Sequence, residues 1–314
     1  MGKNVIVIGG ANVDIVAVPD QELRMYDSNP GHALISFGGV GRNLAENLTR
    51  LGCNVRFVTI FGNDSFSRAL RADTQEKGID ISLSKILPDA GCSKYICLNS
   101  HEGDMIAAIN DMSLYDRMEE AITPEVMDAV NESDILVMDA NTSTELLEKI
   151  ADQCSIPIAF DAVSVAKVER CRNILDRLCI FKPNIFEAAR LCKGETVYGN
   201  AGEYSEEESR QIAAIYGGML RDNGVENVMI SLGSAGVYYE NAQSRGYTDS
   251  MVREIINTSG CGDAFLAGVI RGYLDGADIC RMSEYGSAAA AICARSPETV
   301  SPQLSFERLF DQEA

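Results

Sequence analysis

Apolar residues along the chain gather into short runs that alternate with longer amphipathic segments. The run at 4–10, "NVIVIGG", is rich in β-branched residues and ends in glycine, which predicts a buried strand. Residues 41–52, "GRNLAENLTRLG", carry leucine and alanine at helical spacing and predict an amphipathic helix. The run at 54–62, "NVRFVTIFG", predicts a second strand, so the chain opens with a strand, a helix and a strand.

From residue 123 onward the alternation becomes regular. The pattern predicts strands at 134–140, 156–164, 179–184 and 227–239, and helices after Thr123-Pro124, over 144–153, after 184, from about 205, over 263–274 and over 285–296. Strands joined through helices form a mainly parallel sheet covered on both faces, a three-layer α/β/α arrangement. No repeat or proline-rich linker divides the chain, so residues 1–314 are expected to form a single domain.

Two segments interrupt the alternation. Residues 14–38 are mixed and turn-rich, too long for a plain βα loop, and predict short strands that stand off the core. Residues 92–112 contain "KYICLN" and "DMIAAIND" separated by "SHEG", which predicts a hairpin. We expect the two segments to form a small β-strand lid beside the main sheet.

Composition narrows the class of partner. The chain has 46 acidic and 27 basic residues and a net charge of −19, which repels phosphate backbones and argues against a nucleic-acid partner. No run approaches the ~20 apolar residues of a membrane span, so no membrane partner is expected. Ten cysteines without a C-x-x-C pair, and only two histidines, favour reduced thiols in a cytoplasmic protein over a metal site.

The stretch at 257–268, "NTSGCGDAFLAG", puts small residues before an acid that opens an apolar helix. The first turn of a helix has unpaired N–H groups and the positive end of the dipole, which favour an anion, and Gly260 and Gly262 let a phosphate come close. A carboxylate repels a bound anion, so Asp263 fits better as an acceptor for the proton of a hydroxyl that attacks phosphorus. A glycine turn before a core helix is the alternative that spacing alone leaves open.

This stretch resembles the second signature of the ribokinase, or PfkB, family of carbohydrate and nucleoside kinases. Other motifs of that family appear in the same order as "FGGVGRNLAENLTRLG" (37–52), "KPNIFEAARL" (182–191) and "SLGSAGVYY" (231–239). Within the family, "ANVDI", "DSNPG", "GGVGRN" and "AINDM" are most similar to the pseudouridine kinases. The resemblance implies a ribokinase-like fold with a β-strand lid, and transfer of the γ-phosphate of ATP to the 5′-hydroxyl of pseudouridine.

The resemblance also implies roles for the phosphoryl-transfer residues. Asp263 matches the general base, and the N–H groups of Gly260, Cys261 and Gly262 match the anion hole, with cysteine where the family usually has alanine. Asn184 and Glu187 match the residues that hold Mg²⁺ and phosphates, with Glu187 acting on the ion through water. A helix start with a capping Asn and a Glu is the alternative for that pair.

ATP is expected to lie across "SLGSAG" (231–236) and the alanine-rich helix predicted over 285–296. The expected contacts are Ser231, Gly233, Gly236 and, as a guess for the adenine, Ala288. The first aspartate of the second signature is Asn257 here, which leaves a monovalent cation site such as K⁺ in doubt. Tight helix packing is the alternative explanation of the alanines.

Substrate contacts are expected in the amino-terminal half. Asp14 offers two acceptors for vicinal ribose hydroxyls, with Asn12 beside it, and Gly38 and Gly39 give close backbone approach to the sugar. The further candidates, which include those for reading the base, are Asn29, Arg42, Asn43, Asn110 and Asp111. Lys167 is expected to reach the substrate or a phosphate, or else to be a solvated surface lysine.

Other functions remain open at this point. A kinase for another nucleoside or for ribose is the nearest alternative, and a homodimer through the lid is expected in either case. A dinucleotide-binding oxidoreductase is disfavoured because Gly9-Gly10 is not followed by the G-x-G-x-x-G pattern. A nucleoside sensor without catalysis is disfavoured because Asp263 and its glycines are all present.

Overall fold

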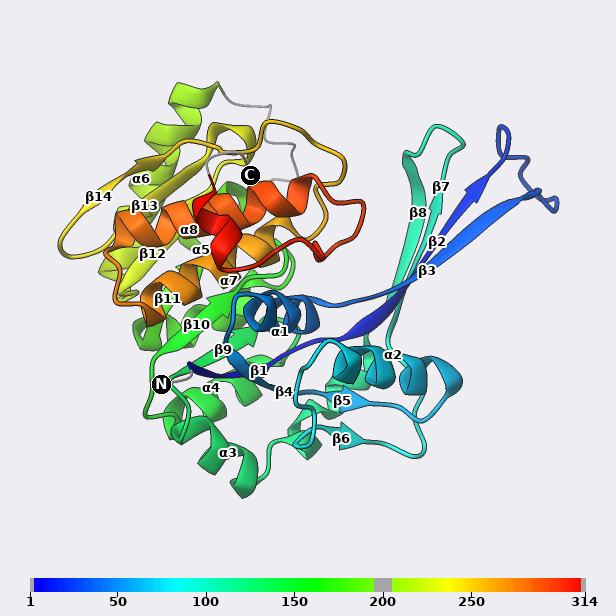
Figure 1. The fold of residues 1–314 in the computed structure, drawn as a ribbon, viewed down its shortest axis with the longest axis horizontal. Coiled ribbons are helices and arrows are strands. Elements are labelled where there is room, and N and C mark those ends of the chain that lie inside the picture. The colour runs from blue at the N-terminus through cyan, green and yellow to red at the C-terminus, as the bar shows by residue number, and fades with distance from the viewer. Residues whose placement is uncertain (1–2, 195–204, 312–314) are drawn as a thin grey trace.

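The computed structural model describes residues 3–194 and 205–311, whose centre is an eight-stranded sheet (Figure 1). The strand order is β14-β13-β12-β11-β10-β9-β1-β4. The strands are β1 (Asn4–Ile8), β4 (Asn54–Val58), β9 (Ile135–Asp139), β10 (Ile158–Asp161), β11 (Leu178–Lys182), β12 (Asn227–Ser231), β13 (Val237–Glu240) and β14 (Arg245–Thr248). Only β13 runs antiparallel to its neighbours, so the predicted mainly parallel sheet is confirmed.

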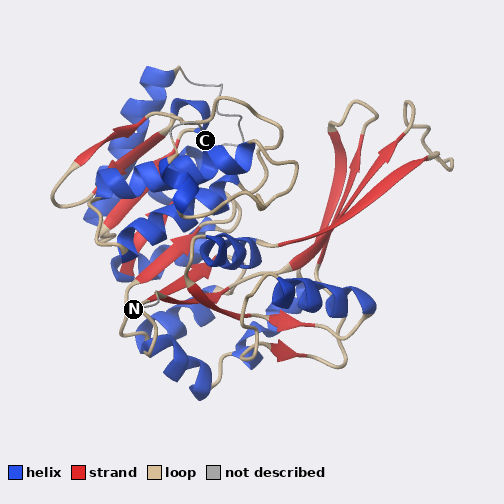
Figure 2. Cartoon of the chain, in the orientation of Figure 1, coloured by secondary structure: helices blue, strands red, loops and turns tan. Residues whose placement is uncertain are grey.

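Helices cover both faces of this sheet and make the predicted three layers (Figure 2). They are α1 (Val40–Arg50), α2 (Ser65–Glu76), α3 (Pro124–Asn131), α4 (Thr144–Gln153), α5 (Ile185–Lys193), α6 (Glu206–Asp222), α7 (Cys261–Leu274) and α8 (Ile279–Ala294). Short 3₁₀ segments span Ser113–Ala121, Val168–Arg177, Gly233–Ala235 and Glu307–Phe310. Helices α3, α4, α5 and α6 pack on one face, and α1, α2, α7 and α8 pack on the other.

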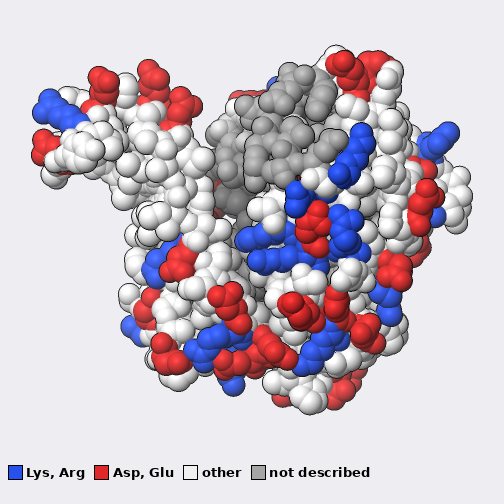
Figure 3. Space-filling model, turned by 180° about the vertical axis from the view of Figure 1, so that it is seen from behind, with Lys and Arg blue, Asp and Glu red and all other residues white. Residues whose placement is uncertain are grey.

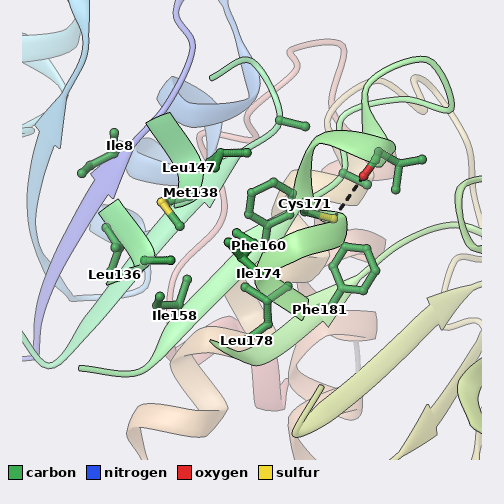
Figure 4. Packing of buried hydrophobic residues seen from close by; sticks show 14 of the residues in the cluster. Ile8, Leu136, Met138, Leu147, Ile158, Phe160, Cys171, Ile174, Leu178 and Phe181 are labelled. Carbon is green, nitrogen blue, oxygen red and sulfur yellow. Dashed lines mark hydrogen bonds between the residues drawn. The ribbon is translucent and has the colours of Figure 1, made fainter. Parts of the chain in front are cut away.

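The alternation of side chains in β1 separates the two cores. Ile6 and Ile8 join the core under α3 to α6, whereas Val5 and Val7 join the core under α1, α7 and α8. Figure 4 shows the first core, where Phe160 and Phe181 lie with their ring centroids 6.2 Å apart. Both faces of each central strand are therefore buried, which explains why these strands read as continuous apolar runs.

Side-chain caps set the beginnings of several helices. Thr123 accepts the Val126 N–H before α3, with Pro124 at the first helical position as the sequence predicts. Asp64 accepts the Ser67 N–H at 2.7 Å and so fixes the start of α2. These caps satisfy N–H groups that a helix leaves unpaired at its first turn.

A second sheet of four strands projects away from the three layers (Figure 1). Its order is β3-β2-β7-β8, from β2 (Asn12–Pro19), β3 (Gly31–Gly38), β7 (Lys94–Asn99) and β8 (Met105–Asp111). We call it the lid sheet. The predicted hairpin is present as β7 and β8, and the segment at 14–38 forms two eight-residue strands that are longer than expected.

Two strand boundaries differ from the prediction. The run at 54–62 breaks at Thr59, whose hydroxyl lies 3.0 Å from the Tyr115 hydroxyl, and continues as β5 (Ile60–Phe61) in a small sheet with β6 (Lys85–Ile86). The run at 227–239 turns back at Gly236 (φ 89°) between β12 and β13. Within the described residues, no helix has the length and apolar character that crossing a membrane requires.

Candidate active site

Charged and polar side chains gather at the carboxyl ends of the central strands. Asp139 ends β9, Asp161 ends β10 and Lys182 ends β11, and all three are buried. Next to them, β1 has β4 on one side and β9 on the other, so the chain leaves this point in opposite directions. Such a switch point at the carboxyl edge of a parallel sheet is where ligands bind in open α/β folds.

Glycines bring the end of β1 against the start of α1. Gly39 caps α1 with φ 98°, and a Cβ there would lie 2.6 Å from the Ala11 Cα. A Cβ on Gly41 would lie 2.7 Å from the Gly9 carbonyl carbon. The backbone N–H of Gly10 is held by the buried Asp139 carboxylate at 2.8 Å. The double-glycine motif therefore serves a close backbone approach at the switch point.

Asp263 lies in the first turn of α7, as predicted, and is 9% exposed. Its Oδ2 accepts a hydrogen bond of 2.8 Å from Asn43 Nδ2 on α1, so two predicted site residues that are far apart in the sequence meet. Burial and the nearby Asp161 carboxylate raise the pKa of Asp263 to about 7, against the opposing effects of the Asn43 bond and the Lys182 ammonium. A carboxylate with this pKa can accept a proton near neutral pH.

The turn before Asp263 is held by its glycines. Gly260 has φ 81°, and a Cβ there would lie 1.9 Å from the Thr299 carbonyl oxygen. A Cβ on Gly262 would lie 3.1 Å from Lys182 Nζ. The N–H groups at the start of α7 are therefore presented by a backbone that other residues cannot reproduce without displacing Thr299.

Lys182 links the sheet to this turn. Its Nζ lies 3.0 Å from Asp161 Oδ2 and donates to the Gly262 carbonyl oxygen at 3.4 Å. Burial alone lowers the pKa of Lys182, but the carboxylates of Asp161, Glu187 and Asp263 outweigh it and raise that pKa above its ordinary value. The ammonium is therefore charged and balances a cluster of buried acids.

A cavity of about 610 Å³ adjoins the start of α7. The predicted residues among its lining are Asn184, Ser231, Gly233, Gly236, Cys261 and Gly262. Helix α8 contributes Ser287, Ala290 and Ala294, which share one helical face. Ala288 does not line this cavity; it is half-buried against the core beside α7, and its contact with the adenine stays a prediction. The cavity thus reaches the turn before Asp263, where Cys261 and Gly262 line it.

Asn184 and Glu187 form a capping box at the start of α5. Asn184 Oδ1 accepts the N–H groups of Phe186 and Glu187, and Glu187 Oε2 accepts the Asn184 N–H at 2.8 Å. Burial raises the pKa of Glu187 to about 7, although the Lys182 ammonium lowers it. The alternative reading of a helix cap is thus correct for the local structure, and the role toward a metal stays a prediction.

Asn12, Asp14 and Gly38 meet where the lid sheet joins the body. Asn12 Nδ2 donates to Asp14 Oδ1 at 2.5 Å, and a Cβ on Gly38 would lie 2.2 Å from Asp14 Oδ2. Burial raises the pKa of Asp14, and the Asn12 bond and the Arg42 guanidinium oppose that shift. The Asn12 bond fixes one oxygen of the Asp14 carboxylate, and any side chain at position 38 would displace the other.

Of the candidates for reading the base, Asn110 lies on the same face of the lid sheet as Asp14, and Asn29 lies in a turn. Strand pairing puts Asp14 beside Tyr95 and Tyr95 beside Asn110, so all three point to one face of the lid sheet. Asn29 instead bonds the Arg24 backbone and closes the turn between β2 and β3. The Asn29 amide is thus bonded within its own turn, and its part in reading the base stays a prediction.

Arg42 and Asp111 are also engaged within the protein. The Arg42 guanidinium pairs with Asp73 and with Glu46, and its side chain is buried. Asp111 Oδ1 accepts the Ser113 hydroxyl at 2.7 Å. Both side chains therefore have partners within the protein, although the buried Arg42 Nε has none.

The side chains of Lys167 and Asn257 are both hydrogen-bonded within the protein. Lys167 Nζ donates to Asn141 Oδ1 at 2.6 Å and burial lowers its pKa, so it is not a solvated surface lysine. The Asn257 side chain accepts the Ser259 N–H and donates to the Pro297 carbonyl, which occupies it within the loop. A cation beside Asn257 would have to use backbone carbonyl oxygens.

Sequence reasoning missed Lys182 and Tyr95. Lys182 ends a predicted strand directly before Pro-Asn, which is a signal for a residue at the carboxyl edge of the sheet. Tyr95 stands two residues before Cys97 in a strand with period-two alternation, but its face depends on the register with β2. That register is not visible from the sequence.

Comparisons with known proteins agree with this geometry. The profile of the pfkB family carbohydrate kinases matches residues 2–305. The chain is 30% identical to a pseudouridine kinase of Escherichia coli (strain K12) over 308 residues, which cover 96% of this chain and 94% of the relative.

Among solved structures, a carbohydrate kinase from Agrobacterium tumefaciens superposes with a TM-score of 0.82 at 27% identity, covering 98% of this chain and 95% of the other. An Arabidopsis thaliana ribokinase complexed with ribose and ATP has a TM-score of 0.84 at 18% identity and covers 98% of both chains, which bears on the fold. The ribokinase-like fold and a family profile matched over nearly the whole length show that the chain belongs to the pfkB family of carbohydrate kinases, phosphotransferases with an alcohol group as acceptor.

Proposed function

We propose that this protein transfers the γ-phosphate of ATP to the 5′-hydroxyl of pseudouridine and yields pseudouridine 5′-phosphate. The observation that carries the proposal is Asp263, a buried carboxylate with a pKa of about 7 beside the N–H groups that open α7. In this role Asp263 accepts the proton of the hydroxyl as its oxygen attacks phosphorus. A general base of this kind contributes about 10²–10⁴-fold to the rate.

The start of α7 supplies the complementary charge. The N–H groups of Gly260, Cys261 and Gly262 stabilise the negative charge of the phosphoryl group in transfer, and the positive end of the helix adds to them. The Lys182 ammonium, fixed by Asp161 at 3.0 Å, lies on the same side and limits repulsion between Asp263 and the phosphates.

ATP fits the cavity of about 610 Å³, with Ser231, Gly233 and Gly236 along it and Ser287 and Ala290 as the α8 surface for the adenine. The relatives that carry ribokinase and pseudouridine kinase names support a nucleotide donor. In this pose the phosphates point to the turn that opens α7, whose Cys261 and Gly262 line the same cavity.

The residues present fit Mg²⁺. Among the residues that the structure describes, no three or more His, Cys, Asp or Glu side chains form a metal cage. Mg²⁺ keeps several waters and binds through one or two carboxylates and the phosphates of a nucleotide, so a cage is not needed. Glu187 uses Oε2 for the Asn184 N–H and retains its second oxygen for a water of the ion. The ion would neutralise phosphate charge.

A monovalent cation such as K⁺ belongs to the same proposal. It would bind to backbone carbonyl oxygens of the loop at Asn257 rather than to the side chain, which is bonded within the loop. Ten free thiols support a reducing, cytoplasmic location for the enzyme.

The lid sheet supports a nucleoside over a free sugar. Asp14 lies where the lid sheet joins the body, and Asn110 points to the same face two strands away. The spacing of neighbouring strands puts roughly 10 Å between the backbones of these two residues. Tyr95 lies between them, and its ring can pack on the base while Asp14 holds the ribose hydroxyls.

Pseudouridine has one ring N–H more than uridine, and Asn110 supplies an acceptor for it. Asn110 is exposed in the structure, and a base bound over it would bury its amide. Uridine would then leave that buried acceptor unpaired, which costs about 1–3 kcal/mol, or roughly ten- to a hundredfold in specificity. Replacing Asn110 by alanine is therefore expected to lower the ratio of kcat/KM for pseudouridine to kcat/KM for uridine. That ratio should fall by a larger factor than kcat for either nucleoside.

A substrate panel tests the proposal. The full chain is incubated with ATP, Mg²⁺ and one of pseudouridine, uridine, cytidine, adenosine or ribose, and each product is identified by mass and by ³¹P NMR. The expected result is fastest formation of the 5′-monophosphate of pseudouridine. If another substrate of the panel is phosphorylated faster, that substrate replaces pseudouridine in the proposal. If no substrate of the panel is phosphorylated, the proposed kinase activity is rejected.

We also propose that the lid sheet forms a homodimer through its second face. Strand pairing aligns Ile35, Ile15, Ile96 and Ile109 in one row across four strands, and three of them are at least 40% exposed. Figure 3 shows this projecting sheet with few charges along its stem and charged residues at its tip. An apolar row of this kind is typical of an interface, and it leaves the Asp14 face to the substrate.

The oligomeric state in solution tests the dimer. Light scattering after size exclusion is expected to give twice the mass of the chain, 34.0 kDa, and Ile109→Lys is expected to give the single chain. A single-chain mass for the unmodified protein at micromolar concentration would contradict the dimer.

A further inference from the structure

Two thiols meet where the anion-binding turn packs against α8. Cys261 is the first residue of α7 and lines the cavity, whereas Cys293 lies in the last turn of α8 and is 1% exposed. Both thiols lie against the same loop, since Cys293 Sγ lies 3.7 Å from the Ser259 carbonyl oxygen. Cys261 Sγ also lies 3.8 Å from the Asn257 carbonyl oxygen, and Cys293 Sγ lies 3.4 Å from the Thr299 carbonyl oxygen. The two thiols therefore lie against one short loop, and Cys261 lines the cavity.

Close packing of α7 on α8 keeps the thiols together. A Cβ on Gly268 would lie 2.5 Å from the Tyr285 carbonyl oxygen, and a Cβ on Gly286 would lie 2.7 Å from the Phe265 ring. Glycines at both positions let the two helix backbones approach closely. The ends of the helices cannot drift apart without losing this contact, so the thiol pair is a fixed feature of the site.

Cys261 is the more reactive member of the pair. Cys261 lies at the start of a helix, whose N–H groups stabilise a thiolate, and it lines the cavity, whereas Cys293 is 1% exposed. Burial raises the pKa of Cys53 to about 11 and that of Cys171 to about 12, so those thiols stay protonated. An accessible attacking thiol beside a buried resolving thiol is the arrangement of redox-sensitive sites.

We propose that a peroxide converts Cys261 and Cys293 into a disulfide and that this bond reversibly switches off phosphoryl transfer. The Cys261 thiolate attacks one peroxide oxygen and breaks the O–O bond, which gives a sulfenic acid and, after protonation, one water. The Cys293 sulfur then attacks the Cys261 sulfur, and the hydroxyl leaves as a second water. Two thiols lose two electrons and two protons, and the peroxide is reduced to two waters.

The bond acts on the site because Cys261 is part of the anion-binding turn. Drawing its sulfur to bonding distance from Cys293 moves the N–H groups of Gly260 to Gly262 and, two residues on, the Asp263 carboxylate. Displacement of a catalytic group by about 1 Å is worth about 10²-fold in rate, so the oxidised enzyme is expected to lose roughly that factor. This regulation rests on the proposed kinase function.

The test uses the full chain and two readouts. Protein is treated with hydrogen peroxide, its disulfides are mapped by mass spectrometry of peptides, and phosphorylation of pseudouridine is measured before treatment, after treatment and after dithiothreitol. The expected result is a peptide pair linked through Cys261 and Cys293, a loss of about a hundredfold, and recovery with dithiothreitol. Cys293→Ala is expected to keep its activity under peroxide, and Cys280→Ala, in the same helix, is expected to behave as the unmodified protein.

Three outcomes would contradict the proposed disulfide switch. Loss of activity without the linked peptides, full activity with them, or equal loss in Cys293→Ala and the unmodified protein would overturn it. The peptide map of the unmodified protein needs no variant, so poor folding of Cys293→Ala does not weaken the test. If no nucleoside is phosphorylated before treatment, the proposed function fails, and absence of the linked peptides would still overturn the disulfide.

Discussion

Replacing Asn43 by alanine is expected to shift the pH dependence of the reaction, because Asn43 holds the proposed base. Its Nδ2 donates to Asp263 Oδ2 at 2.8 Å in a buried site. A hydrogen bond to a charged group contributes about 1.5–3 kcal/mol, and one pKa unit corresponds to about 1.4 kcal/mol. The bond stabilises the ionised carboxylate, so its loss raises the pKa of Asp263 by about one to two units above its value of about 7.

The assay is kcat/KM for the nucleoside at saturating ATP, measured between pH 5.5 and 9.5. The unmodified enzyme is expected to lose activity as pH falls through about 7, since only ionised Asp263 accepts the proton. In Asn43→Ala that midpoint moves up by about one to two pH units. Loss of a substrate contact lowers the whole curve but leaves the midpoint where it is, so the two effects separate.

Asn47→Ala is the matched control. Asn47 is buried on the same helix, one turn further, and its amide donates to the Asn43 carbonyl oxygen rather than to Asp263. The titration of ATP is the same in all three proteins and cancels from the comparison. An unshifted midpoint in Asn43→Ala, or an equal shift in Asn47→Ala, would refute the reasoning.

Three further changes probe the base, the sugar contact and the buried ion pair. Asp263→Asn is expected to lower kcat by at least about 10²-fold while calorimetry finds ATP binding unchanged, because only proton acceptance is lost. Gly38→Ala is expected to raise KM for the nucleoside roughly tenfold or more, since its Cβ would lie 2.2 Å from Asp14 Oδ2. Lys182→Met is expected to lower the free energy of unfolding by about 3–5 kcal/mol in urea titrations, because Asp161 is left buried without its partner.

These changes have their own controls. Gly218→Ala, in an open stretch of α6, should leave KM unchanged, and Lys149→Met, in an exposed pair with Glu119, should cost only about 0–1 kcal/mol. Near-normal turnover in Asp263→Asn would remove the base. An unaltered KM in Gly38→Ala, or a stability loss in Lys182→Met no larger than in Lys149→Met, would contradict the corresponding contact.

The sequence predicts the layers and the position of Asp263 because both are local. Strand and helix periodicities span few residues, and a glycine turn before an apolar helix identifies the start of α7 without knowledge of its neighbours. Boundaries are less predictable: β4 ends at Val58, and the next backbone N–H, that of Thr59, donates to the Ser84 hydroxyl, 25 positions along the chain.

Long-range contacts account for most of what the sequence could not predict. The Asn43–Asp263 bond joins residues 220 positions apart, and Arg42 meets Asp73 across a strand and a turn. The face of α8 toward the cavity depends on how that helix sits on α7, so Ala288 was chosen where its neighbour Ser287 lines the cavity. Side chains that pair across the fold follow from packing and register rather than from local pattern.

A competition between two nucleosides tests the central claim most directly. Equal concentrations of pseudouridine and uridine are offered to the enzyme with limiting ATP, and the ratio of the two monophosphates, which equals the ratio of their kcat/KM values, is measured by liquid chromatography and mass spectrometry. A site in which Asn110 accepts the extra ring N–H predicts a ratio of roughly ten to a hundred in favour of pseudouridine. A ratio of about one would contradict the claim that this enzyme is specific for pseudouridine.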